Sequence, residues 1–137
     1  MYPLSELNYL AILVTAVVIF VIGALWYTVL FGKQWLAAHA YTPEQLEGMK
    51  QGMGRAYGLS FVCYLVLATV MSMLIFLLGI DNAAAGAKLG ALCWLGFVAT
   101  IGFTANLYSN KSFATYLIDA SYQLVFMVVA GVLLAIW

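Results

Sequence analysis

Four long apolar stretches dominate this sequence of 137 residues. They cover about residues 7–31, 56–79, 85–108 and 113–137. An α-helix rises 1.5 Å per residue, so roughly 20 apolar residues are enough to cross the hydrocarbon core of a bilayer. Each stretch is that long, and none has the alternation over ~10 residues that is typical of a membrane β-strand. We therefore predict an all-α integral membrane protein, a four-helix bundle that forms a single domain over residues 1–137.

The composition supports this prediction and excludes other classes. Apolar residues make up 66% of the chain and charged residues only 7%, which is far from the balance of a soluble domain. Five basic and five acidic residues give a formal net charge of zero. A nucleic-acid partner needs a basic surface, so we expect none here, and the lipid bilayer is the expected surroundings.

The loops predict how the spans are connected and oriented. Short turns at 80–82 and 110–112 join the spans into two antiparallel hairpins, and we expect Asp81 to cap the third helix. The basic residues of the two loops on one side are Lys33, Lys50, Arg55 and Lys111. The positive-inside rule places that side in the cytoplasm and both termini outside it. Aromatic residues that include Trp26 and Tyr27 cluster at the same side, as in an aromatic belt.

The one sizeable loop, between the first and second spans, contains a helix signal. Thr42 as N-cap, Pro43 at the first position and Gln45 in a capping box predict a helix over about 43–53. Its apolar residues are Leu46, Met49 and Met53, with charged residues on the rest of the circumference. We expect a short amphipathic helix in the membrane interface, which serves as a connector or, alternatively, as part of a gating hinge.

The fourth span carries its polar residues on one face. At about 100° per residue, one sector contains Ser112, Thr115, Tyr116, Asp119, Tyr122, Gln123, Phe126 and Ala130. Asp119 lies seven residues into the span, roughly 10 Å along the helix axis. A carboxylate at membrane depth costs about 2.5–3.5 kcal/mol, so it should be paired, protonated or hydrated.

Residues near the same end are candidate partners of Asp119. They are Lys33, Arg55, Lys111 and Asn106, with Tyr122 and Gln123 one turn away on the same helix. The functional interpretation makes Asp119 a proton or cation site. The structural interpretation makes it an anchor that ties the fourth span to a basic residue near the interface.

Small residues predict a close helix contact at the head of the third span. Ala83, Ala87 and Ala91 run beside Gly86 and Gly90, which is a small-xxx-small surface. Packing within the bundle and a subunit interface are the two uses it could have.

Motifs for enzymatic chemistry are missing from the sequence. Cys63 and Cys93 lie in different spans at opposite depths, so we predict two free thiols. His39 is the single histidine, and no cluster has the spacing of a metal site. We expect neither a metal nor a cofactor, and no enzyme activity.

Several short motifs, in order, resemble a known family. They are Leu25-Trp26-Tyr27, Phe31-Gly32-Lys33-Gln34-Trp35, Trp94-Leu95-Gly96-Phe97, Asn106-Leu107-Tyr108 and Leu117-Ile118-Asp119-Ala120-Ser121-Tyr122. Together they resemble the small prokaryotic four-span proteins catalogued as domain of unknown function 1761. The resemblance implies a protein of the bacterial cytoplasmic (inner) membrane and carries no activity, ligand or catalytic residue.

Two functions remain open at this stage. The first is a homo-oligomeric transporter or channel, with a dimer favoured, for a small solute or ion. Its site would consist of Asp119, Tyr122 and Gln123, faced by Asn106 or Lys33. The second is a non-catalytic accessory or assembly subunit of a larger membrane complex.

Overall fold

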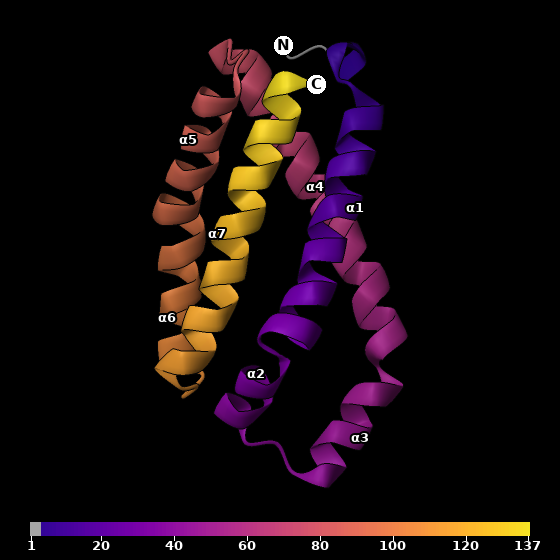
Figure 1. Ribbon diagram of the computed structural model, residues 1–137, viewed down its shortest axis with the longest axis vertical. Helices are drawn as coiled ribbons and strands as arrows, with labels where there is room; N and C mark the ends of the chain where they lie inside the picture. The colour runs from indigo at the N-terminus through magenta and orange to yellow at the C-terminus, as the bar shows by residue number, and fades with distance from the viewer. Residues whose placement is uncertain (1–3) are drawn as a thin grey trace.

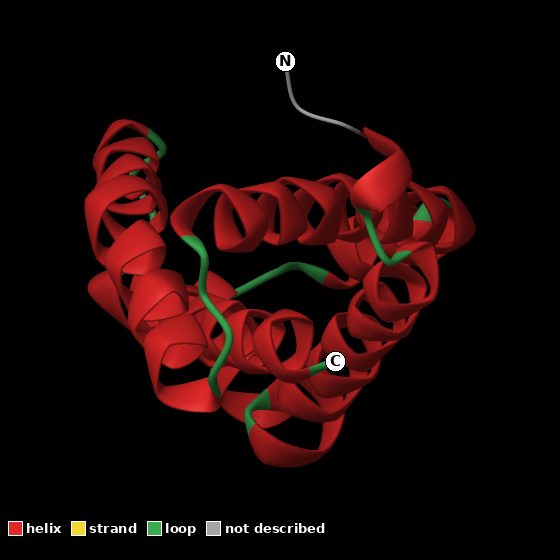
Figure 2. Ribbon diagram, turned by 90° about the horizontal axis from the view of Figure 1, so that it is seen from above, coloured by secondary structure: helices red, strands yellow, loops and turns green. Residues whose placement is uncertain are grey.

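The computed structural model describes residues 4–137, which fold into helices joined by short loops (Figures 1 and 2). After the short 3-10 helix η1 (Leu4–Glu6), the order is α1 (Tyr9–Leu25), η2 (Trp26–Leu30), α2 (Gly32–His39), α3 (Pro43–Gln51), α4 (Met53–Leu78), α5 (Ala83–Cys93), η3 (Trp94–Ala99), α6 (Thr100–Tyr108) and α7 (Phe113–Ile136). No strand is present in the described part of the chain, which confirms the all-α prediction.

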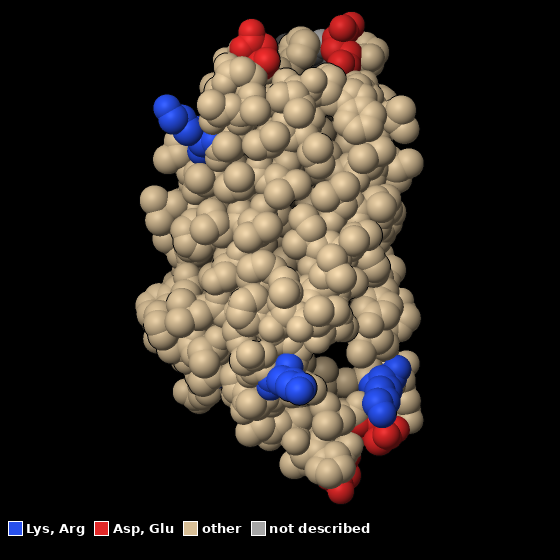
Figure 3. Space-filling view, viewed as in Figure 1, with Lys and Arg blue, Asp and Glu red and all other residues tan. Residues whose placement is uncertain are grey.

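Within residues 4–137, four helices are long and apolar enough to cross a membrane. They are Tyr9–Leu30, Met53–Leu78, Ala83–Tyr108 and Phe113–Ile136. The second span begins three residues earlier than the sequence predicted, because α4 starts directly after Gly52. Charged side chains gather toward the two ends of the molecule and leave a charge-free band between them on the face shown in Figure 3. The chain is therefore a multi-pass membrane protein.

Helix α7 is the centre of the bundle. It contacts α5 most extensively and also packs against α1 and α4 (Figure 1). Its buried residues include Tyr122, Phe126, Met127 and Ala130, whereas the lipid-side residue Leu117 is exposed. One end of the bundle carries η1 and the end of α7 and is called the terminal end below, and the other carries α2 and α3 and is called the α3 end (Figure 1). Asp119, near the start of α7, belongs to the α3 end.

Polar side chains cap the beginnings of α1, α3, α5 and α7. The capping box at Thr42 and Gln45 is confirmed, with the Thr42 side chain accepting the Gln45 N–H at 3.2 Å. The expected cap at Asp81 is wrong, because the side chain of Asn82 accepts the Ala85 N–H at 2.9 Å instead. Asn82 has the extended backbone of an N-cap, which leaves Asp81 one position outside the helix.

The loop between the first two spans contains two helices. The predicted amphipathic helix is α3, and its apolar residues Leu46 and Met49 are half-buried while Glu44 and Glu47 are exposed. The shorter α2 was not predicted. It follows directly on the first span and ends at Ala40, whose φ of 51° is left-handed.

Glycines bring α5 and α7 together at the terminal end of the bundle. Gly86 and Gly90 of α5 are buried against backbone atoms of Gly131 and Met127 of α7. A Cβ at Gly86 or Gly90 would overlap a backbone carbonyl oxygen of α7. The small residues at the head of the third span therefore serve packing within the bundle, through the glycines rather than the neighbouring alanine row.

Two spans contain a π-helical segment that the sequence analysis did not predict. The segments are η2 in the first span and η3 in the third, and each begins at a tryptophan. Such segments widen a helix by one residue and often mark functional regions. The segment η2 lies at the end of the first span that belongs to the α3 end, and η3 lies at the middle of the third span.

Candidate functional site

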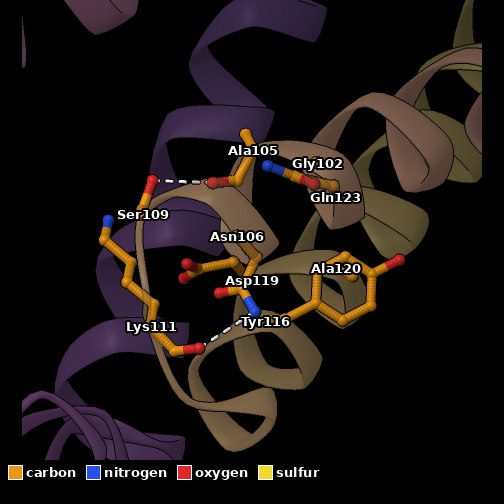
Figure 4. Close-up of a pocket in the computed structure, with 9 residues that line it drawn as sticks. All are labelled: Gly102, Ala105, Asn106, Ser109, Lys111, Tyr116, Asp119, Ala120 and Gln123. Atoms are coloured by element: carbon orange, nitrogen blue, oxygen red, sulfur yellow. Dashed lines mark hydrogen bonds between the residues drawn. The ribbon is translucent and has the colours of Figure 1, made fainter.

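A pocket of about 180 Å³ lies between α6, the turn that follows it and the first half of α7 (Figure 4). Its polar lining residues are Asn106, Ser109, Lys111, Tyr116, Asp119 and Gln123, and its small ones are Gly102, Ala105 and Ala120. The pocket lies toward the α3 end, where α6 and α7 are joined. Polar groups of different kinds therefore converge at the edge of an otherwise apolar bundle.

Asp119 is half-buried and takes part in one hydrogen bond between spans. The Tyr27 phenol, from η2, donates to Oδ1 of Asp119 at 2.6 Å. In Figure 4 the Asp119 carboxylate points to the side of the pocket on which Asn106, Ser109 and Lys111 lie. The same carboxylate therefore joins α7 to the first span and lines the pocket beside the third.

Among the described residues, no basic group pairs with Asp119. Within residues 4–137 the one ion pair is between Lys50 and Glu47 of α3, at 3.5 Å on the surface. None of the basic residues expected as partners lies within ion-pair distance of Asp119, namely Lys33, Arg55 and Lys111. Lys111 does line the same pocket and is exposed. The anchor of Asp119 is thus a phenol of the first span and not a cation.

The structure brings together three of the five residues that the sequence analysis assigned to a site. Asp119, Asn106 and Gln123 line the pocket. Tyr122 lies next to them on α7 but points into the bundle, where its hydroxyl donates to the Ile19 carbonyl at 2.9 Å. Lys33 is exposed on α2 and does not line the pocket.

Asn106 also stabilises the turn that closes the pocket. Its side-chain amide donates to the Lys111 carbonyl at 3.2 Å, and the Lys111 N–H donates to the Asn106 carbonyl at 3.4 Å (Figure 4). Asn110, inside this turn, has a φ of 56°, which asparagine tolerates better than most residues. The buried side chain therefore fixes the pocket rim, because it and the Asn106 backbone both bond to Lys111 at the end of the turn.

Two tryptophans flank Asp119, and the sequence analysis did not assign them to the site. The indole N–H of Trp26 donates to the Ile118 carbonyl at 3.1 Å, and that of Trp94 donates to the Ala120 carbonyl at 2.9 Å. The two carbonyls belong to the residues immediately before and after Asp119. Since Trp26 begins η2 and Trp94 begins η3, both π-helical segments start where an indole bonds to α7.

Sequence signals for these contacts are weak. Tyr27 and Trp26 fit an aromatic belt, and nothing in the spacing indicates that they reach α7 rather than the interface.

The two cysteines are free, as predicted. Residues 4–137 contain no group of three potential metal ligands.

Fold and site together define a helical multi-pass membrane protein with a carboxylate in a pocket at one end of its bundle. Residues 10–135 match the family described as "Protein of unknown function (DUF1761)", so the chain belongs to that family. No curated protein and no solved structure matches the chain.

Proposed function

We propose that the protein transports a small cation, in the broad sense that includes the proton, and binds it at the Asp119 pocket. The observation that carries the proposal is a carboxylate within a membrane span that lines a polar pocket and lies within ion-pair distance of no basic residue in the described chain. Burying such a charge costs about 2.5–3.5 kcal/mol even on lenient scales. A bound cation would offset that cost.

The other groups of the pocket suit the same role. The amides of Asn106 and Gln123 present oxygen atoms, which are the ligands that hard cations prefer. The exposed ammonium of Lys111 stands at the same pocket and opposes a second positive charge. We expect a single monovalent charge to be taken up at a time, because a divalent ion would meet that repulsion with one carboxylate.

We also propose where the protein acts and how it is oriented in the membrane. The basic residues of the α3 end favour a cytoplasmic opening of the pocket in the bacterial inner membrane, with both termini outside. Four helices rarely enclose a complete pathway, so the working unit would be a homo-oligomer, with a dimer favoured. No enzyme activity is proposed.

The test is cation flux in liposomes that contain the purified protein. Proton flux is followed with a trapped pH dye under an imposed potassium diffusion potential, and monovalent cations are followed as radioactive sodium and rubidium. Asp119→Asn should reduce the flux to that of empty liposomes. Asp81→Asn, a matched change at the exposed turn, should leave it unchanged. Equal flux of every tested cation in the wild type and Asp119→Asn would contradict the proposal.

An accessory subunit is the second candidate, and one observation favours it. Asp119, through Tyr27, and the two indoles tie α7 to both neighbouring spans, which fits a purely structural role for the carboxylate. Under this alternative Asp119→Asn lowers the amount of protein in the membrane without a change in flux. Native mass spectrometry of gently extracted protein would then detect a second chain beside multiples of 14.9 kDa.

A further inference from the structure

Thr15 has the one buried side-chain polar atom without a hydrogen-bond partner in the described chain. The residue is fully buried on α1, and its hydroxyl contacts no acceptor or donor of residues 4–137. Other threonines of the spans donate to the carbonyl four residues earlier, namely Thr28, Thr69, Thr100 and Thr104. A buried, unsatisfied hydroxyl is costly, so its retention needs an explanation.

The interior beside α1 contains three phenols from three different spans. The Tyr122 hydroxyl of α7 donates to the Ile19 carbonyl and lies 3.3 Å from the Tyr64 hydroxyl of α4. The ring of Tyr27 meets the ring of Tyr122 edge-on, with centroids 5.4 Å apart. Tyr27 in turn donates to Asp119. Tyrosine rings in mutual contact therefore lead from the pocket carboxylate into the bundle.

These groups follow one strip of the first span. Counting back from Tyr27 in steps of four residues gives Gly23, Ile19 and Thr15, which follow one another over about 18 Å of the helix, each offset by about 40° from the one before. A Cβ at Gly23 would lie 2.6 Å from the Tyr122 hydroxyl, so the glycine makes room for that phenol. Along this strip come, in order, a phenol, a glycine that makes room for a second phenol, a carbonyl that accepts a hydrogen bond, and a hydroxyl without a partner in the described chain.

We propose that this strip is a proton path that runs from Asp119 through Tyr27, Tyr122 and Tyr64 to Thr15, with water molecules between hydroxyls that are not in direct contact. The inference rests on the proposed function and names its cargo as the proton. Thr15 would bind one of these waters, which would satisfy its hydroxyl. Because a proton moves along hydroxyls and water while a metal ion needs a ligand shell, a narrow interior lined by hydroxyls is selective for protons.

Each step of the path makes and breaks O–H bonds only. A proton from the pocket binds the Asp119 carboxylate and forms the neutral acid, whose O–H then donates to the Tyr27 oxygen. As that oxygen gains the proton, the phenol releases its own proton to the next hydroxyl or water. At the end of the step Asp119 is again a carboxylate and the hydroxyl groups are neutral, and the proton that enters at Asp119 leaves at Thr15.

Apolar residues close the interior beyond Thr15. Ile12, Ala11 and Leu7 of the same chain segment are buried, and Ile75 of α4 is buried in the same core. Release of the proton at the terminal end therefore requires this apolar layer to open. The path is expected to act as a gated carrier and not as a permanently open channel.

The decisive test compares Thr15→Val with Thr15→Ser in the proton-flux assay. Valine keeps the shape of threonine and removes the hydroxyl, so the protein should remain folded, since no satisfied hydrogen bond is lost. We expect proton flux to fall by at least about tenfold in Thr15→Val, the effect of one unmade hydrogen bond on a rate, and to persist in Thr15→Ser. Thr104→Val, on the exposed face of α6, is the control and should retain the wild-type flux.

A second variant tests the middle of the path. Tyr122→Phe should lower proton flux as strongly as Thr15→Val, whereas Tyr108→Phe, at a residue that is 87% exposed, should not. Wild-type flux in Thr15→Val would overturn the path, and the proposed function would still stand if Asp119→Asn is inactive. Sodium or rubidium flux that depends on Asp119 and exceeds proton flux would also overturn it. An active Asp119→Asn variant would instead refute the proposed function itself.

Discussion

On its α5 side α7 packs through glycine backbone, and on its α1 side it packs through aromatic rings and hydroxyl groups. Gly131 of α7 meets Gly86 of α5 with no side chain between the two helices. Across the helix, Tyr122 and Phe126 fill the space toward α1 and α4, with ring centroids 4.9 Å apart. The first contact depends on close approach alone, while the second depends on where individual polar atoms find partners.

The difference shows how the bundle can be rigid on one side and polar on the other. Lipid tails are as apolar as leucine, so helices in a membrane gain little from burying apolar surface and rely on packing and hydrogen bonds instead. The glycine contact fixes the terminal halves of α5 and α7. The opposite side of α7 can then carry Asp119 and the phenols without being the sole support of the fold.

The largest predicted loss of stability comes from a change at the glycine contact between α5 and α7. Gly86→Ala places a Cβ against the Gly131 carbonyl, which is backbone and cannot turn aside. We expect a loss of about 3 kcal/mol in the free energy of unfolding, the upper range for overpacking. The measurement is unfolding in detergent micelles, followed by circular dichroism.

Gly58→Ala is the matched control for this change. A Cβ at Gly58 meets nothing within 4 Å, so the variant should unfold like the wild type or slightly later. Equal stability of the Gly86→Ala and Gly58→Ala variants would show that α5 and α7 are free to separate, and the comparison of the two sides would fail.

The spans and the polar face of α7 could be predicted because they depend on local sequence. Apolar length alone defines a span, and a spacing near 3.6 residues places Asp119 and Gln123 on one face. The capping box at Thr42 is equally local. The choice between Asp81 and Asn82 was wrong because both residue types cap well, and only the backbone conformation decides between neighbouring positions.

The contacts between spans could not be predicted, because the register of one helix against another leaves no mark in a single sequence. Asp119 was expected near a lysine or arginine on grounds of charge, yet the phenol of Tyr27 is its partner. The π-helical segments were also out of reach. Each coincides with a tryptophan that bonds to a carbonyl of α7, which is a tertiary contact and not a local propensity.

A smaller loss of stability is expected from changes on the side of α7 that carries the polar contacts. Trp26→Phe and Trp94→Phe each remove an indole N–H that donates to a carbonyl beside Asp119. Each carbonyl keeps its place in the α7 backbone, so we expect about 1 kcal/mol of destabilisation per variant. The indoles reach α7 from different spans, and the double variant should lose the sum.

Unfolding of the same micelle samples measures these losses, with Trp137→Phe at the half-exposed end of α7 as the control. A loss confined to Trp26→Phe would mean that the third span does not hold α7 through its indole. A control variant as unstable as the other two would mean that the loss of ring volume, and not of the hydrogen bond, causes the effect.

The smallest loss of stability is expected at the N-cap of α5, the helix that contributes Gly86 and Gly90 to the contact with α7. Asn82→Ala removes the side chain that accepts the Ala85 N–H, and N-caps of this kind contribute about 1 kcal/mol or less at an exposed helix end. Asp81→Ala leaves that cap intact and should change the unfolding free energy by a few tenths of a kcal/mol at most. If Asp81→Ala is instead the more damaging of the two, the carboxylate caps α5 in the membrane and the assignment to Asn82 is wrong. If Asn82→Ala loses about as much stability as Gly86→Ala, the entry of α5, rather than the glycine contact, determines how firmly that side of α7 is packed.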